Sequence, residues 1–180
     1  HNLDTFEAKA CITDGAGDKQ IDAVYIDDQS STIYIIQGKF YKGDTVDADP
    51  LREVTSSWIQ IKNLAKLQEA ANEKLQAKIS EIATALEDDY KVCFELITTS
   101  GLTDSAKSDL AAFQTELAES ETMSANLVLV DNETLQARYD EALNRNRPYI
   151  NYEFSIEQGK YMEMQIGATR AVIAAIPLKE

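Results

Sequence analysis

The stretch that decides the fold is residues 20–40, which reads QIDAVYIDDQSSTIYIIQGKF. Residues 20–26 and 33–40 are rich in β-branched and aromatic side chains, so each is expected to form a buried strand. The polar link between them, residues 27–31, has the Asp, Gln and Ser composition of a turn. The sequence therefore predicts a β-hairpin.

Three polar residues of this hairpin stand in an otherwise apolar setting. Asp22 lies near the start of the first strand, and Gln37 and Lys39 lie two residues apart on the second. Because side chains alternate along a strand, Gln37 and Lys39 project from the same face. Burying an acid, an amide and an amine together is costly unless the groups pair or serve a purpose. These residues are the first candidates for a functional site.

The order of these residues resembles the PD-(D/E)xK nuclease superfamily, and the Gln-x-Lys form is similar to that of Mrr-type restriction endonucleases. The phrases DGAGDKQIDAVYIDD and IYIIQGKF look closer still to the N-terminal domain of abortive-infection phage-resistance proteins of the AIPR kind. The tail AVIAAIPLKE resembles the start of the main domain of those proteins, near residue 176. The specific resemblance covers about residues 6–40, and elsewhere only the order of elements matches.

The resemblance implies an α/β fold with a restriction-endonuclease-like three-layer core, in which helices flank a mixed central sheet. It implies a metal-dependent endonuclease domain of a bacterial phage-defence protein, which hydrolyses phosphodiesters of DNA or RNA with Mg²⁺ or Mn²⁺. Residues 1–180 would then be a single nuclease-like N-terminal domain of a longer protein. Its expected partners are nucleic acid, bound weakly by this fragment, and the C-terminal domain of the same protein.

The resemblance also assigns roles to individual residues. Asp22 would be the central metal ligand, and the amide oxygen of Gln37 a second, neutral one. Glu7, a helix-borne acid before the hairpin, matches a further ligand of related enzymes. Lys39 would orient the attacking water or stabilise the pentacovalent oxygens. Because Gln37 brings no negative charge, the cation should be held more weakly unless Glu7 contributes.

Each candidate also has an ordinary structural alternative. Asp22 could accept backbone N–H groups at a strand edge, and Gln37 could face solvent. Lys39 could form an ion pair with a nearby acid, and Glu7 could be an exposed helix acid.

The acids of the preceding loop are competing metal ligands. Asp14 and Asp18 lie in this loop beside two glycines. Loop acids in such a setting usually form turns, which is the alternative role for both.

Composition limits the classes of function. The chain has 180 residues, 44% of them hydrophobic, which suits one globular domain. Its net charge of −14 counts against tight nucleic-acid binding by this part alone, because phosphate neutralisation supplies most of that affinity.

No apolar run reaches the roughly 18 residues of a membrane span, so no membrane partner is expected. Cys11 and Cys93 lack zinc-site spacing and fit a reducing cytosol. With His1 the only histidine, an internal Ser-His-Asp triad is excluded.

Two rival interpretations stay open. A non-catalytic binding or oligomerisation module on a nuclease-like fold is favoured by the acidic composition, the neutral Gln37 and a long helix that could form a homodimer contact. A generic α/β domain with a coincidental motif would be supported if Asp22 and Lys39 lay more than about 10 Å apart.

Hydrophobic periodicity and turn residues predict the remaining elements. A long helix is expected over residues 51–88, with a possible bend or break near Asn72. The other expected elements are a helix over 3–11, a strand over 91–99, a helix capped by Thr103 or Asp104, a strand over 126–130, a helix over 132–144, a strand over 149–156 and at least one more strand within 162–176. The strands at 91–99 and 126–130 should pair in parallel.

Overall fold

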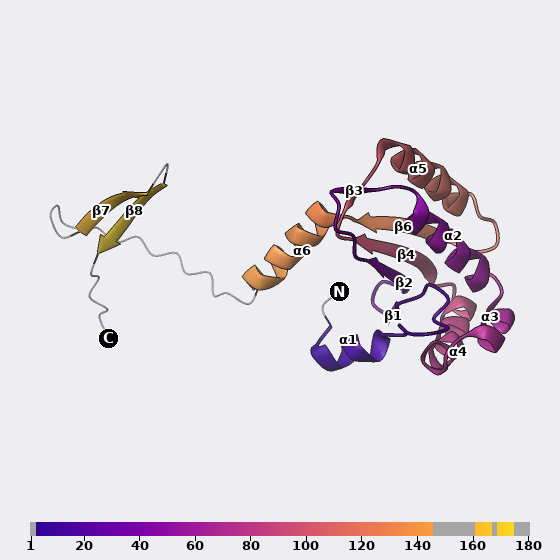
Figure 1. Cartoon of the computed structure of the whole chain (residues 1–180). Coiled ribbons are helices and arrows are strands. Elements are labelled where there is room, and N and C mark those ends of the chain that lie inside the picture. Colours follow the sequence, from indigo (N-terminus) through magenta and orange to yellow (C-terminus); the bar gives the residue numbers. More distant parts are fainter. Residues whose placement is uncertain (1–2, 146–160, 167–168, 175–180) are drawn as a thin grey trace. The chain divides into compact units, whose positions relative to one another are not determined.

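A computed structural model of the chain describes residues 3–145, 161–166 and 169–174 (Figure 1). The chain divides into two compact units, residues 1–142 and 143–180, which are described separately. Within the described residues, none of the helices combines the length and apolar character needed to cross a membrane.

The first unit is built on a four-stranded sheet with the strand order β1-β2-β4-β6. β1 (Ala23–Asp27) pairs antiparallel with β2 (Thr32–Lys39), which confirms the predicted hairpin. β4 (Lys91–Thr98) pairs in parallel with β2 on one side and with β6 (Ala125–Val130) on the other. The sheet is therefore mixed and open. The parallel pairing of β4 with β6 confirms the prediction, whereas the parallel pairing of β2 with β4 was not predicted.

The register places the candidate residues in one patch of the sheet. Ala23 faces Ile36, and Asp22, one residue earlier, donates its N–H to the Ile36 carbonyl over 2.9 Å. Asp22 therefore extends the strand pairing and lies opposite Gln37. Residues opposite each other in an antiparallel pair share a face, so the Asp22, Gln37 and Lys39 side chains lie on the same side of the sheet.

The hydrophobic core lies on this same side, between the sheet and four helices. These are α2 (Asp49–Ile61), α3 (Leu64–Ala70), α4 (Glu73–Glu87) and α5 (Asp104–Ala118). Figure 1 shows α2 and α5 side by side above the strands, with α3 and α4 following α2. Trp58 of α2 is 2% exposed and meets Phe94 of β4 edge-on, with 5.9 Å between ring centroids. This contact fixes α2 over the centre of the sheet.

The prediction of one long helix over residues 51–88 is wrong. The segment forms α2, α3 and α4, with interruptions at 62–63 and 71–72. The Asn63 side chain accepts the Lys66 N–H and the Asn72 side chain accepts the Leu75 N–H, so each Asn begins a new helix. The break expected near Asn72 is confirmed, whereas the one at Asn63 was not predicted. Three short helices can change direction and stay packed against the sheet, whereas one straight helix of this length would extend beyond it.

The remaining elements of the first unit largely follow the sequence. α1 (Thr5–Cys11) begins at the N-cap Asp4, and Thr103, rather than Asp104, caps α5. α6 (Asn132–Arg145) places Arg138 3.2 Å from the buried Glu95 of β4. A short parallel pair of β3 (Thr45–Val46) and β5 (Gly101–Leu102) was not predicted.

In the described part of the second unit, β7 (Tyr161–Ile166) pairs antiparallel with β8 (Thr169–Ala174). This pair confirms the expectation of at least one strand within 162–176. The strand predicted over 149–156 and the domain start predicted near residue 176 lie outside the described residues.

Asn72 ties the loop that precedes β1 to the start of α4. Its Nδ2 donates to the Thr13 carbonyl and its Oδ1 accepts the Leu75 N–H, both over 2.9 Å. Asn72→Ala removes both bonds and should lower the free energy of unfolding by about 2 kcal/mol. Asn63→Ala is the matched control because Asn63 only caps a helix, and it should cost about half as much. Urea unfolding measures both, and equal losses would contradict the anchoring role.

Candidate metal and phosphate site

Asp22 lies where the loop of residues 13–21 enters the hairpin. Its carbonyl accepts the N–H groups of Thr13 and Asp14 over 2.9 and 3.0 Å. Its carboxylate Oδ2 accepts the Gly38 N–H over 2.7 Å. The ordinary role considered for Asp22, that of a backbone acceptor, is therefore present and occupies one carboxylate oxygen. Because Gly38 precedes Lys39, the same bond also makes Asp22 and Lys39 close neighbours.

Glu53 of α2 joins the two candidates on β2. Its Oε2 accepts the Gln37 Nε2–H over 2.6 Å and lies 2.5 Å from the Lys39 Nζ. The sequence analysis missed Glu53, because no local pattern distinguishes it from any other acid in the first turns of a helix. The ion pair considered as an alternative for Lys39 is also present, with Glu53 as its acid.

Gln37 is buried, at 2% exposed, so the alternative in which it faces solvent is wrong. Its Nε2 is bound to Glu53, yet its Oε1 is buried and has no hydrogen-bond partner among the described residues. The Glu53 carboxylate accepts but does not donate, which fixes the NH₂ end of the amide toward Glu53. A buried oxygen without a partner costs about 1–3 kcal/mol, so the Gln37 Oε1 is an unsatisfied acceptor that calls for an explanation.

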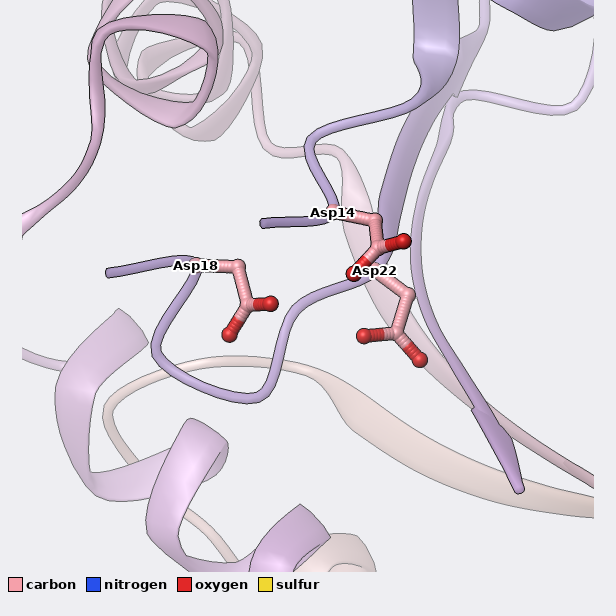
Figure 2. A group of neighbouring side chains, drawn as sticks. All are labelled: Asp14, Asp18 and Asp22. Carbon is pink, nitrogen blue, oxygen red and sulfur yellow. The ribbon is translucent and has the colours of Figure 1, made fainter. Parts of the chain in front are cut away.

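Three carboxylates gather at the loop, as Figure 2 shows. The ligand oxygens of Asp14, Asp18 and Asp22 all lie within 4.8 Å of one another. The Asp18 carboxylate also accepts the N–H groups of Gly15 and Gln20, over 3.1 and 2.9 Å. Asp18 is thus the turn-former that its setting beside glycine suggested, while still facing Asp22.

Neighbouring acids raise the pKa of both Asp22 and Lys39, which disfavours the charged form of Asp22 and favours the charged form of Lys39. Burial raises the pKa of Asp22, and the charges of Asp18 and Asp14 raise it further, against the lowering effects of the Gly38 N–H and Lys39. Burial lowers the pKa of Lys39, but the hydrogen bond and charge of Glu53, with the charge of Asp22, bring it above its usual value. Lys39 therefore keeps its proton, and Asp22 would gain from a nearby cation.

Glu7 is placed differently from the other candidates. Its carboxylate accepts the Asp4 N–H over 2.8 Å and completes the capping box of α1. Glu7 does not belong to the carboxylate group formed by Asp14, Asp18 and Asp22. The structure thus brings together Asp22, Gln37 and Lys39 and adds Glu53. Glu7 is an exposed helix acid, as its alternative had it, and its capping role was not predicted.

No family model, curated protein or solved structure matches this chain. Its function therefore has to be argued from the chemistry of the site.

The raised pKa of Asp22 makes stability depend on pH. Its folded pKa exceeds the unfolded value of about 3.9, so stability should fall as pH rises between the two values, and ionised Asp22 should cost stability above them. Asp22→Asn can still accept the Gly38 N–H without the charge. In a chelating buffer it should melt at a higher temperature than the parent near neutral pH, and at the same temperature below about pH 4.

Thermal melts across this pH range check the prediction. Asp109→Asn is the control, because Asp109 is an exposed acid on α5. A melting difference for Asp22→Asn that does not change with pH would contradict the proposed cause.

Proposed function

We propose that the site hydrolyses phosphodiesters of DNA or RNA with the help of Mg²⁺ or Mn²⁺. The observation that carries the proposal is the buried Gln37 Oε1, which has no partner among the described residues and belongs to the residue opposite Asp22 in the strand pairing. An amide oxygen and a carboxylate are the hard oxygen ligands that Mg²⁺ takes, and the remaining positions are usually filled by water and phosphate.

The residues present fit such a cation. Asp22 and the Gln37 Oε1 would hold it, and Asp14 lies close enough to Asp22 to add a carboxylate. When bound, a divalent cation lowers the pKa of its water and stabilises charge on a phosphate. Glu53 supplies the negative charge that Gln37 lacks, although it comes from a helix rather than from the strand. Glu7 is not needed for this arrangement.

Lys39 supplies the positive charge of the chain itself. Its pKa lies above its usual value, so it stays protonated at neutral pH. Its side chain is 28% exposed, which leaves the ammonium accessible to a phosphate. Glu53 holds this ammonium on the face of the sheet that also carries Asp22 and Gln37. A fixed cation at this place would stabilise the charge that develops on the phosphate oxygens during attack by water.

The finer fold assignment belongs to the same proposal. We infer a restriction-endonuclease-like core, because the candidate residues lie on a hairpin whose second strand also pairs in parallel within a mixed sheet. The role in phage defence, together with the partner domain of a longer protein, is proposed from the sequence resemblance alone.

One observation favours the alternative of a non-catalytic binding module. Lys39 is already paired with Glu53, and this contact would serve equally well as a purely structural ion pair. A cleavage assay separates the two functions.

At least one of plasmid DNA, single-stranded DNA and RNA should be cleaved by the chain in the presence of Mn²⁺ or Mg²⁺. Lys39→Ala and Asp22→Ala should each lower the rate by about 10²-fold or more, because each removes a charge at the reacting phosphate. Lys42→Ala is the matched control, since Lys42 is an exposed lysine three residues away, and its rate should equal that of the parent. A Lys39→Ala variant as active as the parent would overturn the proposal, and so would a parent inactive on all three substrates.

A further inference from the structure

A groove of about 320 Å³ lies where α2 meets α3. Lys19 and Lys66 line it, together with the amides of Gln60 and Asn63, and its apolar lining includes Ile59 and Leu67. The described residues that line it include no Asp or Glu. We call this surface, with Lys19 and Lys66 on its lining, the lysine groove.

The charge of the lysine groove contrasts with that of the chain, which is −14 overall. The residue before Lys19 is Asp18, whose carboxylate belongs to the acidic group with Asp14 and Asp22 and does not line the groove. Lys62 adds a further cation next to Asn63, with its Nζ 4.7 Å from the centre of the Trp58 ring. A polyanion is repelled by most of such a molecule and attracted only where cations gather without acids. The groove is therefore complementary to a strongly anionic ligand.

One face of α2 connects the lysine groove to the candidate site. Glu53 contacts Gln37 and Lys39 at the site. One turn later, the Ser57 hydroxyl donates to the Gln20 carbonyl over 3.1 Å. At the next turn, Gln60 Nε2 donates to the Lys19 carbonyl over 3.4 Å, at the groove.

These contacts set the distance between the site and the groove. Glu53 and Gln60 are seven residues apart, which is about 10 Å along a helix axis. Because a nucleic-acid strand rises about 3.4 Å per nucleotide, this corresponds to about three nucleotides.

We propose that the lysine groove binds the phosphate backbone of a nucleic-acid strand about three nucleotides from the scissile bond. Lys19 and Lys66 neutralise phosphates, and Asn63, whose Oδ1 accepts the Lys66 N–H, offers its amide NH₂ as a donor. The inference rests on the proposed function, because the site determines which anionic polymer is expected. It explains how an acidic chain can receive such a substrate: contact is confined to one cationic track, and affinity depends strongly on salt.

Fluorescence anisotropy of a labelled oligonucleotide, in a chelating buffer that prevents cleavage, tests the groove independently of catalysis. Lys66→Glu should weaken binding about tenfold and reduce the salt dependence of binding by about one unit in the log–log slope. Lys66 is exposed, so the substitution leaves the core intact, and Lys66→Gln should give a smaller loss. Lys107→Glu on α5 is the control, because Lys107 is an exposed helix lysine that does not line the groove, and it should bind like the parent.

Three results would overturn the groove proposal. These are equal affinities for Lys66→Glu and Lys107→Glu, no oligonucleotide binding by the parent at low salt, or equally strong competition by polyglutamate, which would indicate an acidic-peptide groove. The site proposal fails separately. If binding depends on Lys66 but no cleavage occurs, the groove proposal is supported and the nuclease proposal is wrong. If cleavage depends on Lys39 but binding does not depend on Lys66, the nuclease proposal is supported and the groove proposal is wrong.

Discussion

The structure depends on how the buried face of β2 changes from apolar to polar while remaining covered by α2. Ile33 and Ile35 face the core, and the next two residues on that face are Gln37 and Lys39. A buried amide and a half-buried ammonium need an acceptor, which α2 supplies through Glu53. The helix is thereby tied to the strand, yet the amide oxygen of Gln37 keeps no partner among the described residues. A fold selected for stability alone would place an apolar side chain here.

The same helix organises the surroundings of this patch. Through Ser57 and Gln60, α2 holds the backbone of Gln20 and Lys19, both of which adopt left-handed conformations with φ of 63° and 57°. This segment turns the loop acids toward Asp22 and leaves Lys19 at the rim of the lysine groove. An acidic cluster and a cationic groove thus occur close together in one strongly acidic chain. Separation of opposite charges on this scale suits a ligand that brings both phosphate and a cation.

The predictable parts of this site are those that local geometry determines. Strand alternation was enough to place Gln37 and Lys39 on one face, and the turn composition of residues 27–31 was enough to pair the two strands. Glu53 was missed because its role comes from tertiary packing of a helix over a strand. The prediction of one long helix was wrong because the Asn63 and Asn72 side chains accept backbone N–H groups and begin new helices. Hydrophobic periodicity carries no information about this competition. Glu7 was expected to be a metal ligand only because of the resemblance. Its local sequence is equally compatible with the capping role that it has in α1.

The most direct test of the central claim, that Asp22 and the Gln37 amide oxygen hold a divalent cation, is calorimetric titration of the chain with Mn²⁺. The parent should bind the ion, and Gln37→Leu, which fills the same buried space without an oxygen, should bind it about 10-fold or more weakly. Asp47→Asn, which changes an exposed acid, should bind like the parent. If Gln37→Leu binds Mn²⁺ as tightly as the parent, the orphaned oxygen is not a ligand and the proposed metal centre is wrong.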